Sequence, residues 1–212
     1  MNNRKFILKR QELVELLQQK GITHQRVLEA IGQVPRHLFV EPALRHRAYQ
    51  NEALPIGLKQ TISQPYTVAY QTSLLDPAPG ARILEIGTGS GYQAAILCAM
   101  GAQVYTIERH TELLARARQV LDQLHYRVIS RIGDGSIGWP TFAPFEGILV
   151  TAGASTIPEP LIEQLAVGGR LVIPVGNEKT QRMVRITRKS AEEIIQETFD
   201  NFRFVPLITS FT

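Results

Sequence analysis

Residues 85–91, Glu85-Ile86-Gly87-Thr88-Gly89-Ser90-Gly91, decide the fold of this 212-residue chain. The apolar run over 82–86 predicts a buried strand just before the glycines, and the apolar run over 92–100 predicts a helix just after them. Glycines at such a strand-to-helix turn let the backbone bend sharply and approach a ligand, toward which the free N–H groups of the helix point. The stretch therefore predicts a ligand-binding glycine loop.

The segments that follow the loop alternate between strand-like and helix-like patterns. We expect strands over 82–86, 103–107, 127–132, 145–151 and 170–175, and helices over 92–100, 112–124 and 159–166. Strands separated by helices of this length predict right-handed βαβ units and a mostly parallel sheet covered on both faces. After Gly176, strand-like segments over 183–187, 194–195 and 202–208 follow one another without helices. The predicted fold is a doubly wound, Rossmann-like α/β sheet with an antiparallel edge.

The N-terminal part of the chain predicts a helical extension of this sheet. Helical spacing indicates an amphipathic helix over 5–20, a second helix that Thr23 caps and that runs to about Gly32, and a third over 66–76. Residues 50–66 form a long connection without clear periodicity, and such connections are usually functional or disordered. Its apolar content favours a functional segment. We expect one domain over 1–212, with residues 1–79 helical and substrate-facing and 80–212 forming the cofactor-binding sheet.

The composition is that of an ordinary soluble globular protein, with 44% hydrophobic and 20% charged residues. The longest apolar run, residues 94–100, is too short to cross a bilayer, and the N-terminus lacks the features of a signal peptide. The single cysteine, Cys98, excludes an internal disulfide and favours a reducing compartment. We therefore expect a cytoplasmic protein without membrane contact, and a monomer.

The charged residues favour neither a nucleic-acid partner nor a metal. The net charge of +4 comes from basic residues that are spread along the chain rather than gathered in a dense run. Such a distribution is more typical of a solvated surface than of a nucleic-acid footprint. The five histidines lack metal-ligand spacing, so no metal site is expected.

Three acidic residues indicate which ligand the loop binds. Glu108 ends the second predicted strand, where a carboxylate suits hydrogen bonds to ribose hydroxyls. Asp134 follows the third strand, where it could accept a hydrogen bond from an adenine amino group or serve as a turn residue between glycines. Glu85 places negative charge near the loop, which suits a cationic sulfonium or ammonium group better than phosphate. Together with G-x-G-x-G rather than G-x-G-x-x-G spacing, these acids favour S-adenosylmethionine over a dinucleotide.

Nearly the whole chain resembles the protein-L-isoaspartate (D-aspartate) O-methyltransferase family. The resemblance rests on the glycine loop and on these stretches: Val34-Pro35-Arg36, Leu54-Pro55-Ile56-Gly57, Gln60-Thr61-Ile62-Ser63-Gln64-Pro65, Gly133-Asp134-Gly135, residues 168–176 and Phe204-Val205-Pro206-Leu207. The glycine loop is shared by many methyltransferases, whereas the Thr-Ile-Ser-Gln-Pro stretch is specific to this family. The family methylates the free carboxylate of L-isoaspartyl residues in damaged proteins with S-adenosylmethionine, which initiates their repair; activity on D-aspartyl residues is left open.

The resemblance also implies roles for individual residues. Ser63 corresponds to the active-site serine of the family. The expected cofactor-binding residues are Glu85, Gly87, Thr88, Gly89, Ser90, Glu108, Asp134 and Gly135. The expected substrate-binding residues are Leu54, Pro55, Ile56, Gly57, Thr61, Ile62, Pro174 and Val175. Because a carboxylate with a pKa of about 4 is already ionised at neutral pH, it needs no general base. Ser63 is therefore expected to orient the substrate carboxylate through a hydrogen bond, and a simple turn residue is the alternative.

Three other functions are weighed against this one. A methyltransferase for nucleic acid or a small molecule is disfavoured because residues 151–154 lack the Asn/Asp-Pro-Pro-Tyr/Phe stretch that is typical of DNA amino-methyltransferases. A binding module without catalysis is disfavoured by the intact glycine and acidic positions. A nicotinamide oxidoreductase is disfavoured by the glycine spacing and by the number of acids.

Overall fold

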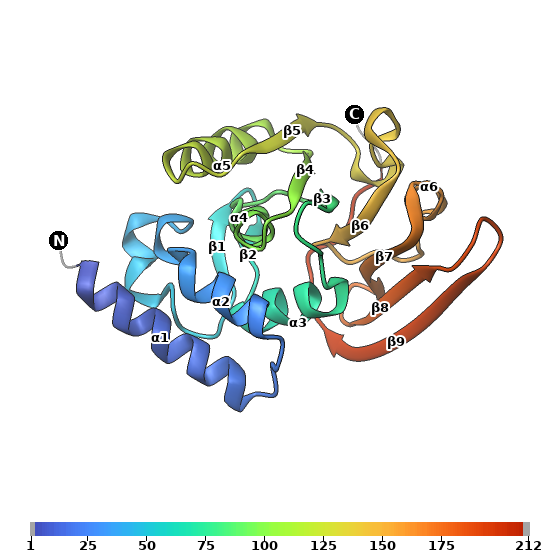
Figure 1. The fold of residues 1–212 in the computed structure, drawn as a ribbon. Coiled ribbons are helices and arrows are strands. Elements are labelled where there is room, and N and C mark those ends of the chain that lie inside the picture. The colour runs from blue at the N-terminus through green and yellow to red at the C-terminus, as the bar shows by residue number, and fades with distance from the viewer. Residues whose placement is uncertain (1–2, 210–212) are drawn as a thin grey trace.

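A seven-stranded sheet forms the centre of the computed structural model, which describes residues 3–209. Its order is β5-β4-β3-β6-β7-β8-β9, with the bounds β3 Arg82–Ile86, β4 Gln103–Glu108, β5 Val128–Ile132, β6 Phe145–Val150, β7 Leu165–Gly176, β8 Gln181–Arg188 and β9 Ile194–Phe202. The pairs from β5 to β7 are parallel, whereas β8 runs antiparallel to both β7 and β9. The predicted sheet with an antiparallel edge is confirmed (Figure 1).

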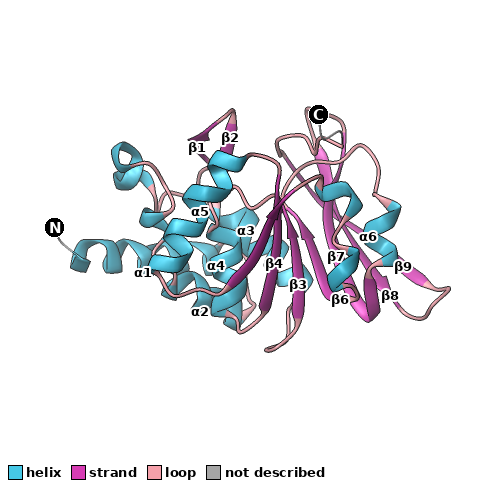
Figure 2. Ribbon diagram, turned by 90° about the horizontal axis from the view of Figure 1, so that it is seen from above, coloured by secondary structure: helices cyan, strands magenta, loops and turns pink. Residues whose placement is uncertain are grey.

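Helices cover both faces of the sheet, as Figure 2 shows. Helices α1 to α5 lie on one side and α6 lies on the other, with the bounds α1 Asn3–Gln19, α2 Gln25–Gln33, α3 Pro65–Leu75, α4 Tyr92–Ala99, α5 Thr111–Gln123 and α6 Glu159–Glu163. Within the described residues there are also four 3₁₀ helices: η1 Arg36–Leu38, η2 Pro42–Arg47, η3 Gly135–Ile137 and η4 Pro140–Phe142. Among the described residues, no helix combines the length and the apolar character needed to cross a membrane.

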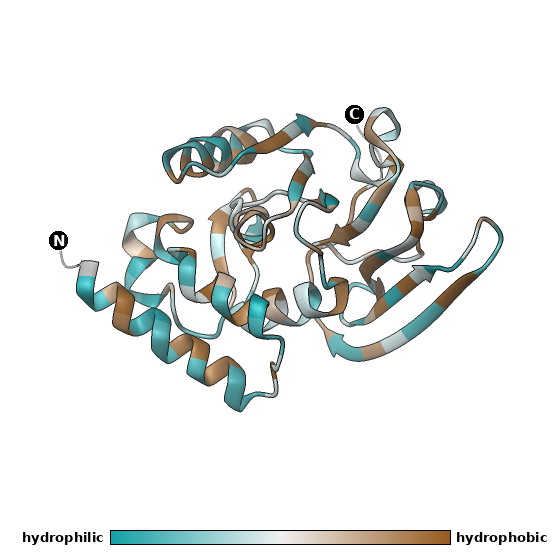
Figure 3. Ribbon diagram, viewed as in Figure 1, coloured by the Kyte–Doolittle hydropathy of each residue, from teal (hydrophilic) through white to brown (hydrophobic). Residues whose placement is uncertain are grey.

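Each face of the sheet buries its own hydrophobic cluster. On β3, Ile83 belongs to the cluster on the helix-rich face, whereas Leu84 and Ile86 belong to the cluster beneath α6. A parallel strand that is buried on both faces reads as a nearly continuous apolar run, which explains why β3 could be located from the sequence. In Figure 3, α1 and α5 alternate between hydrophobic and hydrophilic residues, as expected for helices that cover a core with one side only.

The connection over 50–66 is more regular than predicted. It contains an antiparallel hairpin of β1 Leu54–Gly57 and β2 Gln60–Ile62. The two residues of its turn, Leu58 and Lys59, have positive φ angles of 51° and 58°. Two-residue hairpin turns need such angles and usually use Asn-Gly or Asp-Gly. Because Leu-Lys carries no such signal, the sequence pattern did not reveal the hairpin.

Three further boundaries are corrected. His24, not Thr23, precedes α2, and its side chain makes no capping hydrogen bond. Helix α6 is shorter than predicted, because Leu165 already pairs with Phe145 as part of β7. The segment over 202–208 is not a strand, because β9 ends at Phe202 and only an isolated bridge to Gly153 follows, at Pro206.

The strand order fixes where a ligand can bind. From β3 the chain moves outward to β4 and β5, and then returns to the other side of β3 to form β6 and β7. In open α/β sheets, ligands bind at this switch point, in the crevice outside the carboxyl ends of the strands. The glycine loop lies at the carboxyl end of β3 and thus at the switch point (Figure 1).

Candidate functional site

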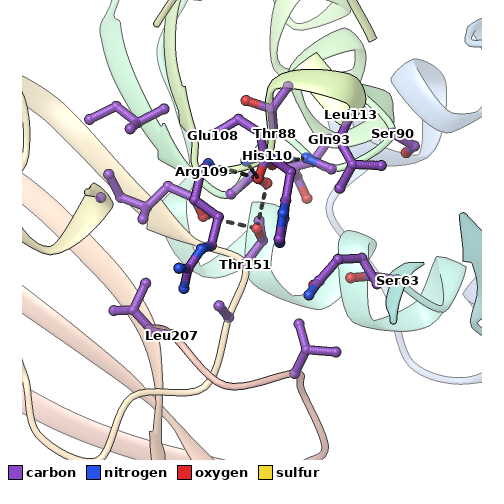
Figure 4. A pocket seen from close by; sticks show the side chains of 18 of the residues that line it. Ser63, Thr88, Ser90, Gln93, Glu108, Arg109, His110, Leu113, Thr151 and Leu207 are labelled. Atoms are coloured by element: carbon purple, nitrogen blue, oxygen red, sulfur yellow. Dashed lines mark hydrogen bonds between the residues drawn. The ribbon is translucent and has the colours of Figure 1, made fainter. Parts of the chain in front are cut away.

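A cavity lies at the carboxyl ends of the central strands, as the strand order predicts. Residues predicted for the cofactor and the substrate line it together, namely Gly87, Thr88, Gly89, Ser90, Glu108, Gly135, Thr61, Ile62 and Ser63. Figure 4 shows Ser63 across this cavity from Glu108 and Arg109, with Thr151 between the two sides. The fold thus brings the glycine loop and the Ser63 segment to the same space.

The glycine loop has a backbone that other residues adopt with strain. Gly87, Gly89 and Gly91 have φ angles of 95°, 53° and 87°. Thr151, just after β6, contacts the start of the loop: its hydroxyl oxygen lies 2.9 Å from the Ile86 carbonyl oxygen and 2.7 Å from that of Gly87, so that its one proton is shared between these two acceptors. A Cβ atom on Gly87 would lie 2.5 Å from this hydroxyl oxygen. Gly89 differs, because its added Cβ would meet only Ile56, at 3.6 Å.

Glu108 forms the polar end of the cavity. One carboxylate oxygen accepts from the Gly89 N–H at 2.8 Å, and the other accepts from the N–H groups of Arg109 at 2.8 Å and His110 at 3.0 Å. These bonds tie the end of β4 to the glycine loop. A carboxylate offers about four acceptor sites, so Glu108 retains capacity for a hydroxyl group of a ligand in the cavity.

Glu85 lies where the sequence interpretation did not place it. Its side chain is 0% exposed and is not among the residues that line the cavity, and the expected contact with a cofactor stays a prediction. One carboxyl oxygen of Glu85 accepts a hydrogen bond from the Thr106 hydroxyl at 2.6 Å. The Thr106 hydroxyl in turn lies 2.7 Å from the hydroxyl of Thr88, in the glycine loop. Burial, together with the nearby charge of Glu108, raises the pKa of Glu85 to about 8, although hydrogen bonds from Thr106 and from the Ala94 backbone lower it. Glu85 therefore supports the loop from behind.

Asp134 is partly exposed and is not itself among the residues that line the cavity. It precedes η3 and accepts from the Ser136 N–H at 2.8 Å and from the Ser136 hydroxyl at 2.7 Å. Its neighbours Gly133 and Gly135 line the cavity, and a Cβ on Gly135 would collide with Ile86. The structure thus assigns Asp134 a capping role, and the hydrogen bond to an adenine amino group stays a prediction.

Ser63 lies where two cavities meet. It directly follows β2, is half-buried, and lines a second cavity together with Tyr66, Lys179 and Arg203. Thr61, Thr151 and Val205 also line both cavities. A molecule in either cavity therefore meets the same few side chains.

The remaining predicted substrate residues lie on the β1–β2 hairpin and at the end of β7. On the hairpin, Leu54 and Ile56 are buried in the core, whereas Pro55 and Gly57 are exposed, and none of the four lines either cavity.

Pro174 and Val175 also lie outside both cavities. Their end of β7 pairs with Ala154, whose N–H donates to the Pro174 carbonyl at 2.9 Å. A direct role of these two residues in binding the substrate stays a prediction; the structure shows only that the backbone at this end of β7 is paired.

Sequence reasoning missed the C-terminal wall of the cavity. Residues 205–208 line it because Gly153 holds them: its N–H donates to the Val205 carbonyl at 2.8 Å, and its carbonyl accepts from Leu207 at 2.7 Å. The stretch Phe204–Leu207 carried the family resemblance, which was the available signal. No group of three or more His, Cys, Asp or Glu side chains within residues 3–209 is arranged to hold a metal ion.

Comparisons with known sequences agree with this geometry. A family model described as Protein-L-isoaspartate(D-aspartate) O-methyltransferase matches residues 8–211. The protein-L-isoaspartate O-methyltransferase of Salinibacter ruber is 58% identical over 217 residues, which cover 98% of this chain and 94% of that protein. The protein of the same name from Cytophaga hutchinsonii is 53% identical over 199 residues, which cover 94% of this chain and 90% of that protein.

Solved structures share the fold. One described as a protein-L-isoaspartate O-methyltransferase has a TM-score of 0.82 at 27% identity and covers 93% of this chain and 65% of its own. A putative protein-L-isoaspartate O-methyltransferase from Plasmodium falciparum, in complex with S-adenosyl-L-homocysteine, has a TM-score of 0.81 at 25% identity and covers 94% of this chain and 98% of its own. From the family model and the relatives of high identity, this chain belongs to the protein-L-isoaspartate(D-aspartate) O-methyltransferase family.

Proposed function

We propose that this chain transfers a methyl group from S-adenosylmethionine to the free carboxylate of L-isoaspartyl residues in damaged proteins and peptides. The observation that carries the proposal is the position of Ser63 between two cavities. One cavity holds the glycine loop and Glu108, and the other opens beside Tyr66, Lys179 and Arg203. A methyl donor in the first and a peptide in the second would meet at Ser63.

The first cavity fits the cofactor by its donor and acceptor groups. The spare acceptor site of Glu108 suits a ribose hydroxyl, and the open side of Gly89 suits a ligand lying against the backbone. The segment Gly133–Gly135 is proposed to border the adenine. When bound, S-adenosylmethionine supplies an electrophilic methyl group on a sulfonium.

The residues of the chain then have to orient and desolvate the substrate rather than remove a proton. The substrate carboxylate, with a pKa of about 4, is ionised at neutral pH. The Ser63 hydroxyl donates a hydrogen bond to one carboxylate oxygen and leaves the other free to face the methyl carbon. Val205 and Leu207 exclude water from this oxygen, which strengthens its attack.

Replacement of Glu108 by alanine tests the cofactor site. A hydrogen bond to a charged group contributes about 1.5–3 kcal/mol, so Glu108→Ala is expected to weaken S-adenosylmethionine binding at least about tenfold. Calorimetric titration measures this loss. Glu112→Ala, an exposed acid in the first turn of α5, is the matched control. Unchanged affinity in Glu108→Ala would remove the ribose assignment.

Replacement of Ser63 by alanine tests the orienting hydrogen bond. Loss of one bond to a carboxylate is expected to lower turnover of an isoaspartyl peptide by about one to two orders of magnitude. Cofactor affinity should stay nearly unchanged, and Ser63→Thr, which keeps the hydroxyl, should retain more activity. Steady-state kinetics at saturating cofactor measure the turnover of the wild type and both variants. Wild-type turnover by the alanine variant, or a methylated Ser63 that passes its methyl group on, contradicts an orienting role.

The cellular setting is also part of the proposal. We propose a monomeric, cytoplasmic repair enzyme that acts as one domain, takes damaged proteins as partners and has no nucleic-acid partner. The single cysteine and the spread of basic residues support the compartment and the partner class. One domain is supported by a hydrophobic cluster that runs from Leu13 in α1 to Phe204 near the C-terminus.

A further inference from the structure

One arginine is completely buried between the N-terminal helices and the Ser63 segment. Arg36, in η1, is 0% exposed. Its Nε donates to the Ala48 carbonyl at 2.8 Å. Its Nη2 donates to the Ser63 carbonyl at 2.8 Å and to the Glu52 carbonyl at 3.4 Å. One guanidinium thus forms hydrogen bonds to three separate backbone segments: the end of η2, the turn before β1 and the residue after β2.

The same guanidinium also contacts the helix that begins at the glycine loop. The Cζ atom of Arg36 lies 4.8 Å from the centre of the Tyr92 ring, a favourable cation–π distance. Tyr92 is the first residue of α4, directly follows Gly91 and lines the first cavity. Burial lowers the pKa of Arg36 to about 10, although interactions with Tyr92 and Tyr49 raise it. The guanidinium therefore stays charged at neutral pH. Arg36 therefore connects the two sides of the site.

We propose that Arg36 is a positioning residue for the methyl transfer. It holds the main chain of Ser63 at a fixed place relative to the glycine loop, so that the hydroxyl meets the substrate carboxylate beside the methyl donor. A misplacement of about 1 Å can reduce an enzymatic rate about a hundredfold. This proposal rests on the proposed function, because it assumes that Ser63 orients the substrate.

The alternative is a purely structural arginine that contributes only to folding. Arg36→Lys separates the two, because an ammonium group keeps the charge but lacks the planar fork that reaches several carbonyls at once. If Arg36 acts through Ser63, replacing Arg36 lowers turnover only when the serine hydroxyl is present. A structural role predicts the same effect with or without that hydroxyl.

A double-mutant cycle makes this comparison. Turnover of an isoaspartyl peptide is measured at saturating S-adenosylmethionine, per molecule of folded protein, in the wild type, Arg36→Lys, Ser63→Ala and the double variant. We expect Arg36→Lys to lower turnover about tenfold in the wild-type background and less than about twofold in the Ser63→Ala background. Arg26→Lys is the matched control: Arg26 donates to the Met100 carbonyl at 2.9 Å, away from the site, and its replacement should leave turnover unchanged.

Equal losses in both backgrounds, or no loss from Arg36→Lys, overturn the proposal. If Arg36→Lys does not fold, Tyr92→Leu enters the same cycle, because it removes the ring beneath the guanidinium and leaves the carbonyl acceptors in place. The same non-additivity with Ser63→Ala is then expected, and additive losses overturn the proposal. A wild-type protein without turnover would instead refute the proposed function, so the two failures are distinguishable.

Discussion

Gly89→Val is expected to weaken S-adenosylmethionine binding by up to about a hundredfold, while the protein stays folded. Gly89 lines the cavity, and a valine there adds bulk and restricts the backbone at the point where the ligand is proposed to lie. Overpacking commonly costs about 1–3 kcal/mol and occasionally more, and about 2.8 kcal/mol corresponds to a hundredfold in affinity. Within the protein the added Cβ meets only Ile56, at 3.6 Å. Cofactor affinity should therefore fall more than the stability of the fold. Calorimetric titration and thermal melting measure the two effects.

Gly168→Val is the control for backbone strain. Gly168 has a φ of 83°, and a Cβ added there meets nothing within 4 Å. Its replacement should lower the melting temperature through the same kind of strain as Gly89→Val and leave cofactor affinity unchanged. If Gly89→Val melts much earlier than this control and binds normally per folded molecule, the glycine serves the fold alone.

Glu85→Gln is expected to remove a large pH dependence of stability. The pKa of Glu85 is raised from 4.5 to about 8 by burial, so the folded state keeps a proton that the unfolded state loses. Stability contributed by this group is therefore present below pH 4.5, falls as the pH rises and is lost above about pH 8. At about 1.4 kcal/mol per pKa unit, the full change is roughly 5 kcal/mol. The glutamine stays neutral and keeps an acceptor for Thr106.

Urea unfolding at pH 5.5 and pH 8.5 measures this difference. The free energy of unfolding of the wild type should fall between these pH values by more than that of Glu85→Gln, and the variant should be the more stable protein at the higher pH. Glu52→Gln is the control: bonds from Arg47 lower the pKa of Glu52, so its contribution changes only in more acidic solution. Parallel pH profiles for the wild type and Glu85→Gln would contradict a protonated, buried Glu85.

The sequence predicted the parts of the site that local pattern determines. The strand at 82–86, the loop and the following helix lie together in the chain, and their periodicity and glycines act over short distances. Glu108 was found because it is the last residue of a strand, where a side chain can turn into the crevice. The burial of Glu85 was not predicted, because this residue is still inside β3. There it pairs with Thr106 of β4, and side chains at paired positions point to the same face of a sheet.

Other features depended on contacts between distant segments, which no local pattern contains. The C-terminal wall of the cavity arises from the pairing of Gly153 with Pro206, more than fifty residues apart. Pro174 was expected at the substrate because of its family stretch; in the structure its carbonyl accepts from Ala154 and it lines neither cavity, so the expectation stays untested. The hairpin over 54–62 was hidden by a Leu-Lys turn. Arg36 stood in a recognised stretch, but only the fold shows that it reaches Ser63.

The most direct test of the account is transfer of a labelled methyl group to matched peptides. The wild-type protein is incubated with labelled S-adenosylmethionine and two peptides that differ only in an L-isoaspartyl or a normal aspartyl residue, with RNA and DNA in parallel. The account predicts base-labile label, as expected of a methyl ester, on the isoaspartyl peptide and background on the aspartyl peptide and both nucleic acids. Equal labelling of the two peptides, labelling of nucleic acid, or cofactor binding without any transfer would contradict it.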